Sequence, residues 1–436
     1  MQYTANTLEN HWMPFTANRD FKKNPRLFES ASGMYYTNQH GDKVLDGAAG
    51  LFCVTAGHAR PEIVDAVATQ LATLDYSPPF QFGHPASFEF ATKVTRLLPD
   101  SINHIFFGNS GSEAVDSALK IVMAYHRAKG DGRRTRFVGR EKSYHGVNYG
   151  GISVAGLVKN REAFGVGLPG VVHLRHTWLP EHRYTMGQPE QGAELADDLQ
   201  RFCDLHGAEN MACCIVEPVV GAAGVLVPPK GYLERLREIC TANGILLIFD
   251  EVITGFGRTG KAFATDTFGV IPDIMTMAKG LTNGVVPMGA VAVSDEVYDS
   301  IIDSAADGAT ELFHGYTYSA SPVACAAGIA ALGIYEKEGL FERAGKLSPY
   351  FLDAVWSLKG MEVIDDLRGY GLLAGIELKP HPAPSVRGYE ALQRLYEKGL
   401  LVKVTGDCIL LSPPLVISES EIDFMIDTLR EVLDTI

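Results

Sequence analysis

Several apolar runs, each stopped by a polar residue, constrain the fold of this chain most strongly. We expect strands at residues 104–107, 135–139, 211–216, 244–250, 273–278 and 289–293. Strands that are apolar on both faces are typical of a parallel sheet covered by helices. Helical patterns, such as those at residues 61–74 and 230–243, alternate with these runs. The sequence therefore predicts an α/β protein with a mostly parallel central sheet covered by helices.

The pattern changes near residue 320, where short strands alternate with longer helices. We expect helices at 320–337, 341–358, 387–398 and 418–434, and strands near 361–365, 371–378, 400–404 and 408–412. The chain has 436 residues, 46% of them hydrophobic, which is enough for two domains. We expect a large domain at residues 55–320 and a smaller α+β domain at residues 321–436. Residues 1–54 should pack with the small domain.

Lys279 ends one of the predicted strands, and Asp250 ends the strand before it. Burial disfavours the charged form of an amine, and a neutral amine is a nucleophile toward aldehydes. An acid and an amine at neighbouring strand ends suit pyridoxal phosphate (PLP), since the acid holds the pyridine proton and the lysine holds the aldehyde carbon. Taken alone, Lys279 would be an ordinary lysine facing solvent. The paired acid and the motifs below favour the PLP site.

Two more predicted strands are followed by chemically useful residues. Tyr144 follows the strand at 135–139, and Glu217 follows the strand at 211–216. The carboxyl ends of parallel strands lie at one edge of a sheet, so these residues should converge with Asp250 and Lys279. Tyr144 can lie flat against a cofactor ring, although a packed surface tyrosine is the simpler alternative.

Residues 108–113, Gly-Asn-Ser-Gly-Ser-Glu, lie between a predicted strand and a predicted helix. Small residues let the backbone approach an anion, and a helix N-terminus offers free N–H groups. The simpler alternative is a serine that caps the helix, and the two roles are compatible. We expect a phosphate to bind here.

The composition excludes several classes of protein. A net charge of −14 argues against binding to nucleic acid or to an anionic membrane. Seven cysteines without a Cys-x-x-Cys motif indicate a reducing compartment and no zinc or disulfide framework, so no metal site is expected. The N-terminus lacks the features of a signal peptide, and no apolar run approaches the ~18 residues of a membrane span. We expect a cytoplasmic protein.

One motif suggests a different cofactor. Gly255-Phe-Gly-Arg-Thr-Gly260 has the spacing of a dinucleotide-binding loop. The residues after it are a poor start for a helix, and Asp273 begins a strand instead of ending one. A nicotinamide oxidoreductase is therefore a remote alternative, and Arg258 is expected to serve structure or an interface.

Together these motifs resemble one enzyme family. The segments that carry the resemblance are Ile248–Gly260, Pro272–Leu281, Asn109–Glu113, Tyr144–Gly146, Glu217–Gly221 and His314–Ser319. They are similar to the motifs of class III PLP-dependent aminotransferases. Residues 11–18 and 75–85 resemble the branch of ω-amino acid–pyruvate, or β-alanine–pyruvate, transaminases.

The resemblance implies PLP fold type I and a homodimer with shared active sites, possibly assembled into a tetramer. It implies that PLP is bonded to Lys279 and that its pyridine nitrogen pairs with Asp250. The ring would lie between Tyr144 and Val252, with Glu217 near its polar edge. The phosphate would be held by Gly111, Ser112 and Thr317 of the partner subunit, and the substrate pocket would be shaped by Phe52, Phe80 and Phe82.

The implied reaction moves an amino group from an ω-amino acid or amine donor to a keto acid acceptor, pyruvate. A diamine or taurine–pyruvate transaminase is the alternative within the same chemistry. Two positions depart from the branch. Lys403 stands where relatives commonly have an arginine that binds the carboxylate, and Phe52 stands where they often have tryptophan. Lysine keeps the charge but loses the forked geometry of arginine.

Overall fold

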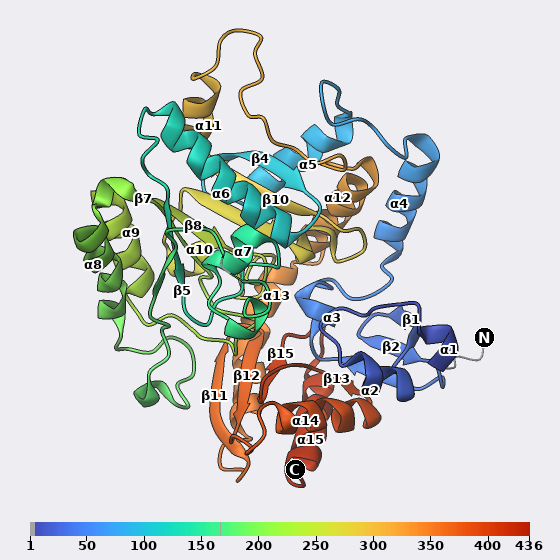
Figure 1. Cartoon of the computed structure of the whole chain (residues 1–436). Coiled ribbons are helices and arrows are strands. Elements are labelled where there is room, and N and C mark those ends of the chain that lie inside the picture. The colour runs from blue at the N-terminus through green and yellow to red at the C-terminus, as the bar shows by residue number, and fades with distance from the viewer. Residues whose placement is uncertain (1–4, 166) are drawn as a thin grey trace.

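The computed structural model describes residues 5–165 and 167–436, and its centre is a seven-stranded sheet (Figure 1). The strand order is β4 (Ile102–Gly108), β10 (Gly289–Ser294), β9 (Ile274–Ala278), β8 (Leu246–Asp250), β7 (Met211–Val216), β5 (Arg136–Arg140) and β6 (Val172–Leu174). Only β10 within this sheet runs against its neighbours. The mostly parallel sheet predicted from the apolar runs is confirmed.

The direction of β10 follows from the length of its connection. Residues 279–288 link β9 to β10. A parallel crossover needs about a dozen residues or more, so this link returns the chain antiparallel.

Helices cover both faces of the sheet, as predicted. One core cluster joins the inner side of α6 (Gly111–Ala128) to one face of the sheet. A second cluster joins α9 (Tyr232–Asn243) to the opposite face. The other helices between β3 and β11 are α3 (Ala49–Phe52), α4 (Pro61–Thr73), α5 (Pro85–Thr95), α7 (Tyr149–Val154), α8 (Asp197–His206), α10 (Ala264–Phe268), α11 (Asp295–Ile302), α12 (Pro322–Lys337) and α13 (Leu340–Trp356).

The C-terminal part forms an antiparallel sheet and helices. Its strands are β11 (Ile364–Tyr370), β12 (Leu373–Leu378), β15 (Cys408–Leu411) and β14 (Lys403–Thr405), in that order, with helices α14 (Val386–Glu397) and α15 (Glu419–Leu433). The strand expected near 361–365 begins later, at Ile364. The single strand expected at 400–404 is divided, because β13 (Leu400–Leu401) joins a different sheet.

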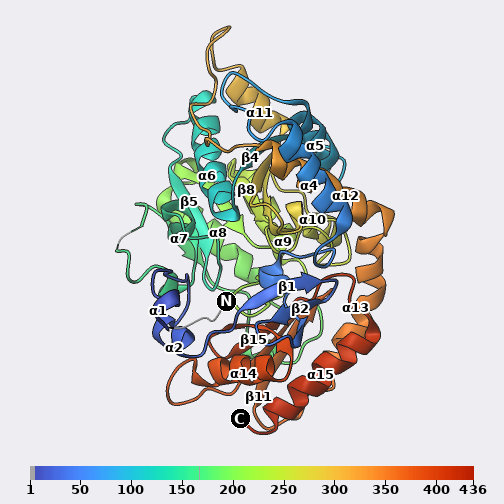
Figure 2. The ribbon, with the colours of Figure 1, turned by 90° about the vertical axis from the view of Figure 1, so that its right-hand side faces the viewer.

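The N-terminal segment contains two short helices, α1 (Ala5–Leu8) and α2 (Asn18–Lys23), and strands β1 (Phe28–Ser32), β2 (Tyr35–Asn38) and β3 (Lys43–Asp46). The edge of this sheet is completed by β13, which pairs in parallel with β3. Figure 2 shows the N-terminal strands beside the C-terminal helices, below the large sheet. Segments from the two ends of the chain are therefore joined by backbone hydrogen bonds.

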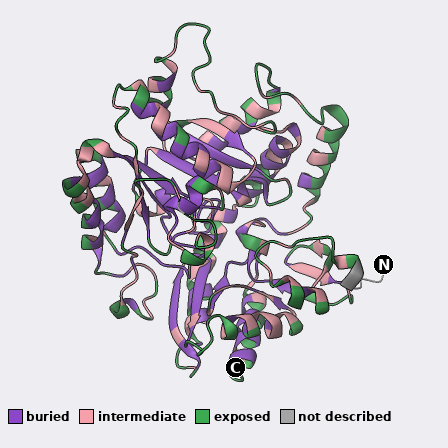
Figure 3. Ribbon diagram, viewed as in Figure 1, coloured by how far each residue is buried: buried purple, intermediate pink, exposed green. Residues whose placement is uncertain are grey.

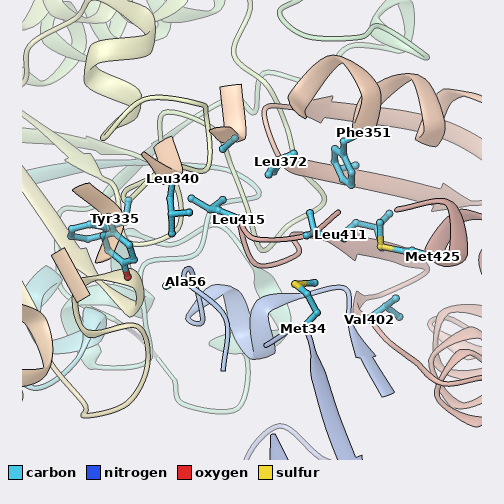
Figure 4. Packing of buried hydrophobic residues seen from close by; sticks show 14 of the residues in the cluster. Met34, Ala56, Tyr335, Leu340, Phe351, Leu372, Val402, Leu411, Leu415 and Met425 are labelled. Atoms are coloured by element: carbon cyan, nitrogen blue, oxygen red, sulfur yellow. The ribbon is translucent and has the colours of Figure 1, made fainter. Parts of the chain in front are cut away.

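The buried core continues from the large sheet to the C-terminal part (Figure 3). Figure 4 shows side chains from both ends of the chain in one cluster, among them Met34, Ala56, Val402, Leu411 and Met425. The first helix of the predicted small domain, α12, packs against α4 and α5. The domain limits at residues 54/55 and 320/321 remain a prediction. No helix among the described residues is long and apolar enough to span a membrane.

Candidate active site

Lys279 directly follows β9 at the carboxyl edge of the sheet. Its backbone is in the left-handed region, with φ of 52°, a conformation that costs about 1–3 kcal/mol in a residue other than glycine. The amine Nζ lies 5.1 Å from the centre of the Phe52 ring. Burial lowers the pKa of Lys279, and the charge of Lys403 lowers it further, while Cys53 and the carboxylates of Asp250 and Glu217 oppose the shift.

Asp250 ends β8 beside this lysine, with 4% of its surface exposed. Its Oδ1 accepts hydrogen bonds from Thr276 Oγ1 at 3.0 Å and from the Val252 amide at 3.2 Å. Its Oδ2 lies 2.7 Å from His145 Nδ1. These contacts fix the direction of both oxygens of the buried Asp250 carboxylate.

Glu217 fixes the loops that follow β5 and β7. Its carboxylate accepts hydrogen bonds from the Tyr144 amide at 2.9 Å and from the Gly221 amide at 3.0 Å. Burial raises the pKa of Glu217, although nearby His145 and these two amides oppose the shift. Burial also raises the pKa of Tyr144, as do the charges of Asp250 and Glu217. The four strand ends converge, as the sequence predicts.

The first turn of α6 provides donors for an anion. Ser110 caps this helix by accepting a hydrogen bond from the Glu113 amide at 3.1 Å, so the capping role considered from the sequence is present. Among the described residues, no acceptor is found for the amides of Gly111 and Ser112. Ser112 Oγ accepts a hydrogen bond from the Val147 amide at 3.1 Å. The helix N-terminus thus keeps two free donors.

Close packing in this corner requires glycine at two positions. A Cβ on Gly111 would lie 3.0 Å from Val252 Cγ1. Gly146 has φ of 89°, and a Cβ there would overlap Ser112. Val252 therefore lies against the start of α6, which links the Asp250 loop to the candidate phosphate site.

The residues expected to contact substrate divide into two groups. Phe52 is buried beside Lys279, and Lys403 is near enough for its charge to act on that amine. The second group is open: Phe80 and Phe82 are 54% and 72% exposed. Thr317, which is expected at the phosphate of the partner subunit and not at the substrate, is also exposed.

Sequence reasoning assigned no role to His145, which lies closest to Asp250. Its side chain is fully buried, and its Nε2 has no hydrogen-bond partner among the described residues. The adjacent Tyr144 drew attention because an aromatic ring suits a planar cofactor. The available indication was that His145 is a polar residue beside Tyr144, after β5, which is separated from β8 and Asp250 by β7.

These residues fit PLP. A buried carboxylate suits a protonated pyridine nitrogen, a half-buried amine with a lowered pKa suits an aldehyde, and a helix N-terminus with free amides suits a phosphate. The glycines at 111 and 146 leave room that larger residues would fill. Among the described residues, no group of three or more His, Cys, Asp or Glu is arranged to hold a metal ion.

Comparisons with known proteins agree with this chemistry. The sequence model of the family described as Aminotransferase class-III matches residues 16–433. An omega-aminotransferase of Caulobacter vibrioides is 55% identical, over 99% of this chain and 98% of that protein. A beta-alanine–pyruvate aminotransferase of Pseudomonas aeruginosa is 48% identical, over 98% and 96%. A solved omega transaminase from Pseudomonas jessenii in complex with PMP has a TM-score of 0.94 at 32% identity, over 100% of this chain and 98% of that chain.

This chain belongs to the class III aminotransferases, a family of enzymes that use PLP. The family resemblance and fold type predicted from the sequence are confirmed.

Proposed function

We propose that this aminotransferase moves an amino group from an ω-amino acid or a simple amine, such as β-alanine, to pyruvate. The products are alanine and an aldehyde, ketone or semialdehyde. The observation that carries this proposal is the half-buried amine of Lys279, which has a lowered pKa, lies 5.1 Å from the Phe52 ring and is influenced by the charges of Asp250 and Glu217. The two relatives named above, at 48% and 55% identity, support the choice of substrates.

Asp250 retains a proton on the pyridine nitrogen of the cofactor. PLP, when bound, supplies an electron sink for the carbon that loses a proton. Thr276, Val252 and His145 contact the carboxylate oxygens and fix their direction, with His145 beside Oδ2. Tyr144 and Val252 would enclose the ring from its two sides, with Glu217 near its polar edge.

Lys279 first holds the cofactor and, once released, moves a proton on and off the substrate carbon. A general base works best with a pKa near the working pH, and burial lowers the pKa of Lys279 toward that range. Gly111 and Ser112 hold the phosphate through their free amides.

Lys403 supplies a cation for the carboxylate of the acceptor. Among the residues that the structure describes, its Nζ makes only long hydrogen bonds, 3.4 Å to the Val404 carbonyl and 3.5 Å to Thr405 Oγ1, so it is available to a ligand. Burial lowers its pKa. Phe52 provides an apolar wall for the donor, and Phe80 and Phe82 extend this wall.

The active form is a homodimer with shared sites, and a tetramer is compatible with it. Support comes from exposed aromatic side chains close to Thr317: Tyr76 donates a hydrogen bond to the Thr317 carbonyl at 3.0 Å, and Tyr318 is 63% exposed. Exposed apolar patches mark protein interfaces. Thr317 of the partner subunit completes the phosphate site. A cytoplasmic location remains a prediction from the composition, and all seven cysteines are free.

The test uses a panel of donors with pyruvate. The PLP-loaded enzyme is given β-alanine, a diamine, taurine or a simple aliphatic amine, and alanine is measured by chromatography. We expect β-alanine or the simple amine to give the highest rate. Lys279→Ala, loaded in the same way, is the control. No alanine above that control from any donor would overturn the proposal, whereas a preference for the diamine or taurine would select the alternative within this chemistry.

The nicotinamide alternative receives no support from the loop at residues 255–260. A Cβ on Gly255 would lie 2.8 Å from the Glu251 carbonyl, and one on Gly260 would lie 2.8 Å from Gly345 Cα. These glycines are packed against the protein itself, which leaves no room for a pyrophosphate.

A further inference from the structure

Two arginines flank the ends of β5, and the hydrogen bonds and ion pairs of one can be compared with those of the other. Arg134 precedes the strand, at the edge of the sheet opposite the site. Its Nη1 donates hydrogen bonds to the carbonyls of Ala208, Met211 and Asn243 at 3.0–3.1 Å. Its Nε is 2.5 Å from Asp131 Oδ2. Arg134 thus has a counter-ion and ties several elements together far from Lys279.

Arg140 ends the same strand at the site edge, and its surroundings differ sharply. The side chain is buried, with 1% exposure. Its Nη2 donates a hydrogen bond to the Glu217 carbonyl at 2.7 Å, and its guanidinium lies 5.7 Å from the centre of the Tyr232 ring. Among the described residues, Nε and Nη1 have no hydrogen-bond partner, and no carboxylate forms an ion pair with Arg140.

A contribution to stability does not account for this arginine. Burying a charge without a counter-ion costs several kcal/mol, and one hydrogen bond to a carbonyl offsets only part of that cost. Replacing a buried charge with an apolar side chain of similar size is often neutral or stabilising. A stability role would therefore favour methionine or leucine here.

The contacts of Arg140 join the two loops that form the site. Its side chain holds the Glu217 backbone, while its own carbonyl accepts a hydrogen bond from Ser143 Oγ at 2.7 Å. Ser143 precedes Tyr144, and the Glu217 carboxylate accepts a hydrogen bond from the Tyr144 amide. A closed set of contacts thus runs from Arg140 through both loops.

We propose that Arg140 is a positioning residue that fixes Tyr144 and Glu217 against the cofactor ring at the expense of stability. This inference rests on the proposed PLP site, since it concerns the residues that enclose the ring. It does not depend on the identity of the donor or the acceptor.

The experiment compares Arg140→Met, Arg140→Lys and Arg134→Met with the wild type. The dissociation constant of PLP is measured by equilibrium dialysis of cofactor-free protein. Circular dichroism in the absorption band of bound PLP reports how the ring is held. Thermal unfolding of the cofactor-free proteins reports stability. None of these measurements needs an amine or a keto acid.

We expect Arg140→Met to bind PLP at least ~10-fold more weakly, the effect of one lost charge-assisted hydrogen bond, and to change the dichroism of the bound cofactor. Its cofactor-free form should unfold no earlier than the wild type. Arg140→Lys should recover part of the affinity. Arg134→Met should unfold earlier and leave PLP affinity and dichroism unchanged.

Wild-type affinity and dichroism in Arg140→Met, or equal losses of affinity in Arg140→Met and Arg134→Met, would overturn the inference. If Arg140→Met does not fold, Arg140→Lys is the deciding variant. PLP affinity and dichroism equal to the wild type in Arg140→Lys would show only that the fold needs a positive charge here, and would also overturn the inference. A wild type that binds PLP but makes no alanine would remove the proposed substrates and leave this inference standing.

Discussion

The strand-edge side of the site and its open side are built in different ways. At the strand edge, Asp250 and Glu217 are buried, Lys279 is half-buried beside them, and the two carboxylates are fixed by neighbouring strands and loops of the same chain. On the open side, Phe80 and Phe82 extend from a loop into solvent. The first side is complete within one chain. The second side consists of aromatic side chains that remain exposed to solvent in one chain.

This difference shows which side of the proposed site a second copy of the chain would complete. A sheet brings side chains together by strand order alone, so Lys279 and Asp250 are brought together within one chain. Loops that expose aromatic rings gain a defined shape when another surface covers them. The proposed dimer therefore completes the substrate and phosphate sides and leaves the acid–amine pair unchanged.

The largest expected effect tests the self-contained side. Asp250→Asn should reduce turnover by at least ~10³-fold, because a neutral amide cannot retain the pyridine proton and about 4 kcal/mol of electrostatic stabilisation is lost. Steady-state rates of a folded, PLP-loaded variant measure this. The dimer should form as in the wild type. Near-normal turnover would remove Asp250 from its proposed role.

Lys403 lies between the two sides and gives the next largest effect. Lys403→Ala should raise the KM for pyruvate by ~10–100-fold, through loss of a charge-assisted hydrogen bond of about 1.5–3 kcal/mol. Donors without a carboxylate should change little in their own half-reaction, and Lys403→Arg should retain or improve the use of pyruvate. Single-turnover kinetics separate the half-reactions. Equal effects on both halves would make Lys403 a structural residue of the C-terminal sheet.

A smaller effect tests the open side. Thr317→Ala should weaken retention of PLP by up to ~10-fold, since one hydroxyl donor to the phosphate is lost. Mixing Thr317→Ala subunits with Lys279→Ala subunits should produce hybrids with one intact site, provided that the sites are shared between subunits. Activity of the mixture is compared with that of each parent at a PLP concentration near the wild-type dissociation constant, where Thr317→Ala alone holds little cofactor. A mixture no more active than the parents would contradict shared sites.

The smallest effect is a shift in pH dependence. The positive charge of Lys403 lowers the pKa of Lys279, so its removal should raise that pKa. Lys279 then loses its proton only at higher pH, and the pH profile for capture of PLP by cofactor-free Lys403→Met should move upward. Lys403→Arg, which keeps the charge, is the control. The rate of the absorbance change on adding PLP measures the profile, and a downward shift would contradict the assigned sign.

Much of the large sheet could be predicted because its strands are apolar on both faces. The strand expected at 211–216 matches β7, and Asp250 and Lys279 mark the ends of β8 and β9 as predicted. Pairing partners were harder to predict. β13 and β14 are adjacent in sequence but join different sheets, and a run of apolar residues does not indicate which edge it will pair with.

The candidate site was predictable where chemistry and strand ends coincide. Lys279, Asp250, Glu217 and Tyr144 could be selected on this basis. His145 was less evident because its role depends on the position of Asp250 on another strand, and a histidine next to a tyrosine carries no such information by itself. Arg140 was missed for a similar reason. Its hydrogen-bond partner is a backbone carbonyl, and because every residue has one, the sequence does not indicate which carbonyl will be the partner.

The pairing of β3 with β13 has a consequence for synthesis of the chain on the ribosome. Leu45 is made early, but its partner Leu400 emerges only after some 350 further residues. At about 5–20 residues per second, the delay is roughly 20–70 s. During that time the edge strand β3 has unpaired backbone N–H and C=O groups, to which other strands can form hydrogen bonds. The large sheet can form meanwhile, but the N-terminal segment reaches its final place only when the last tenth of the protein has been made.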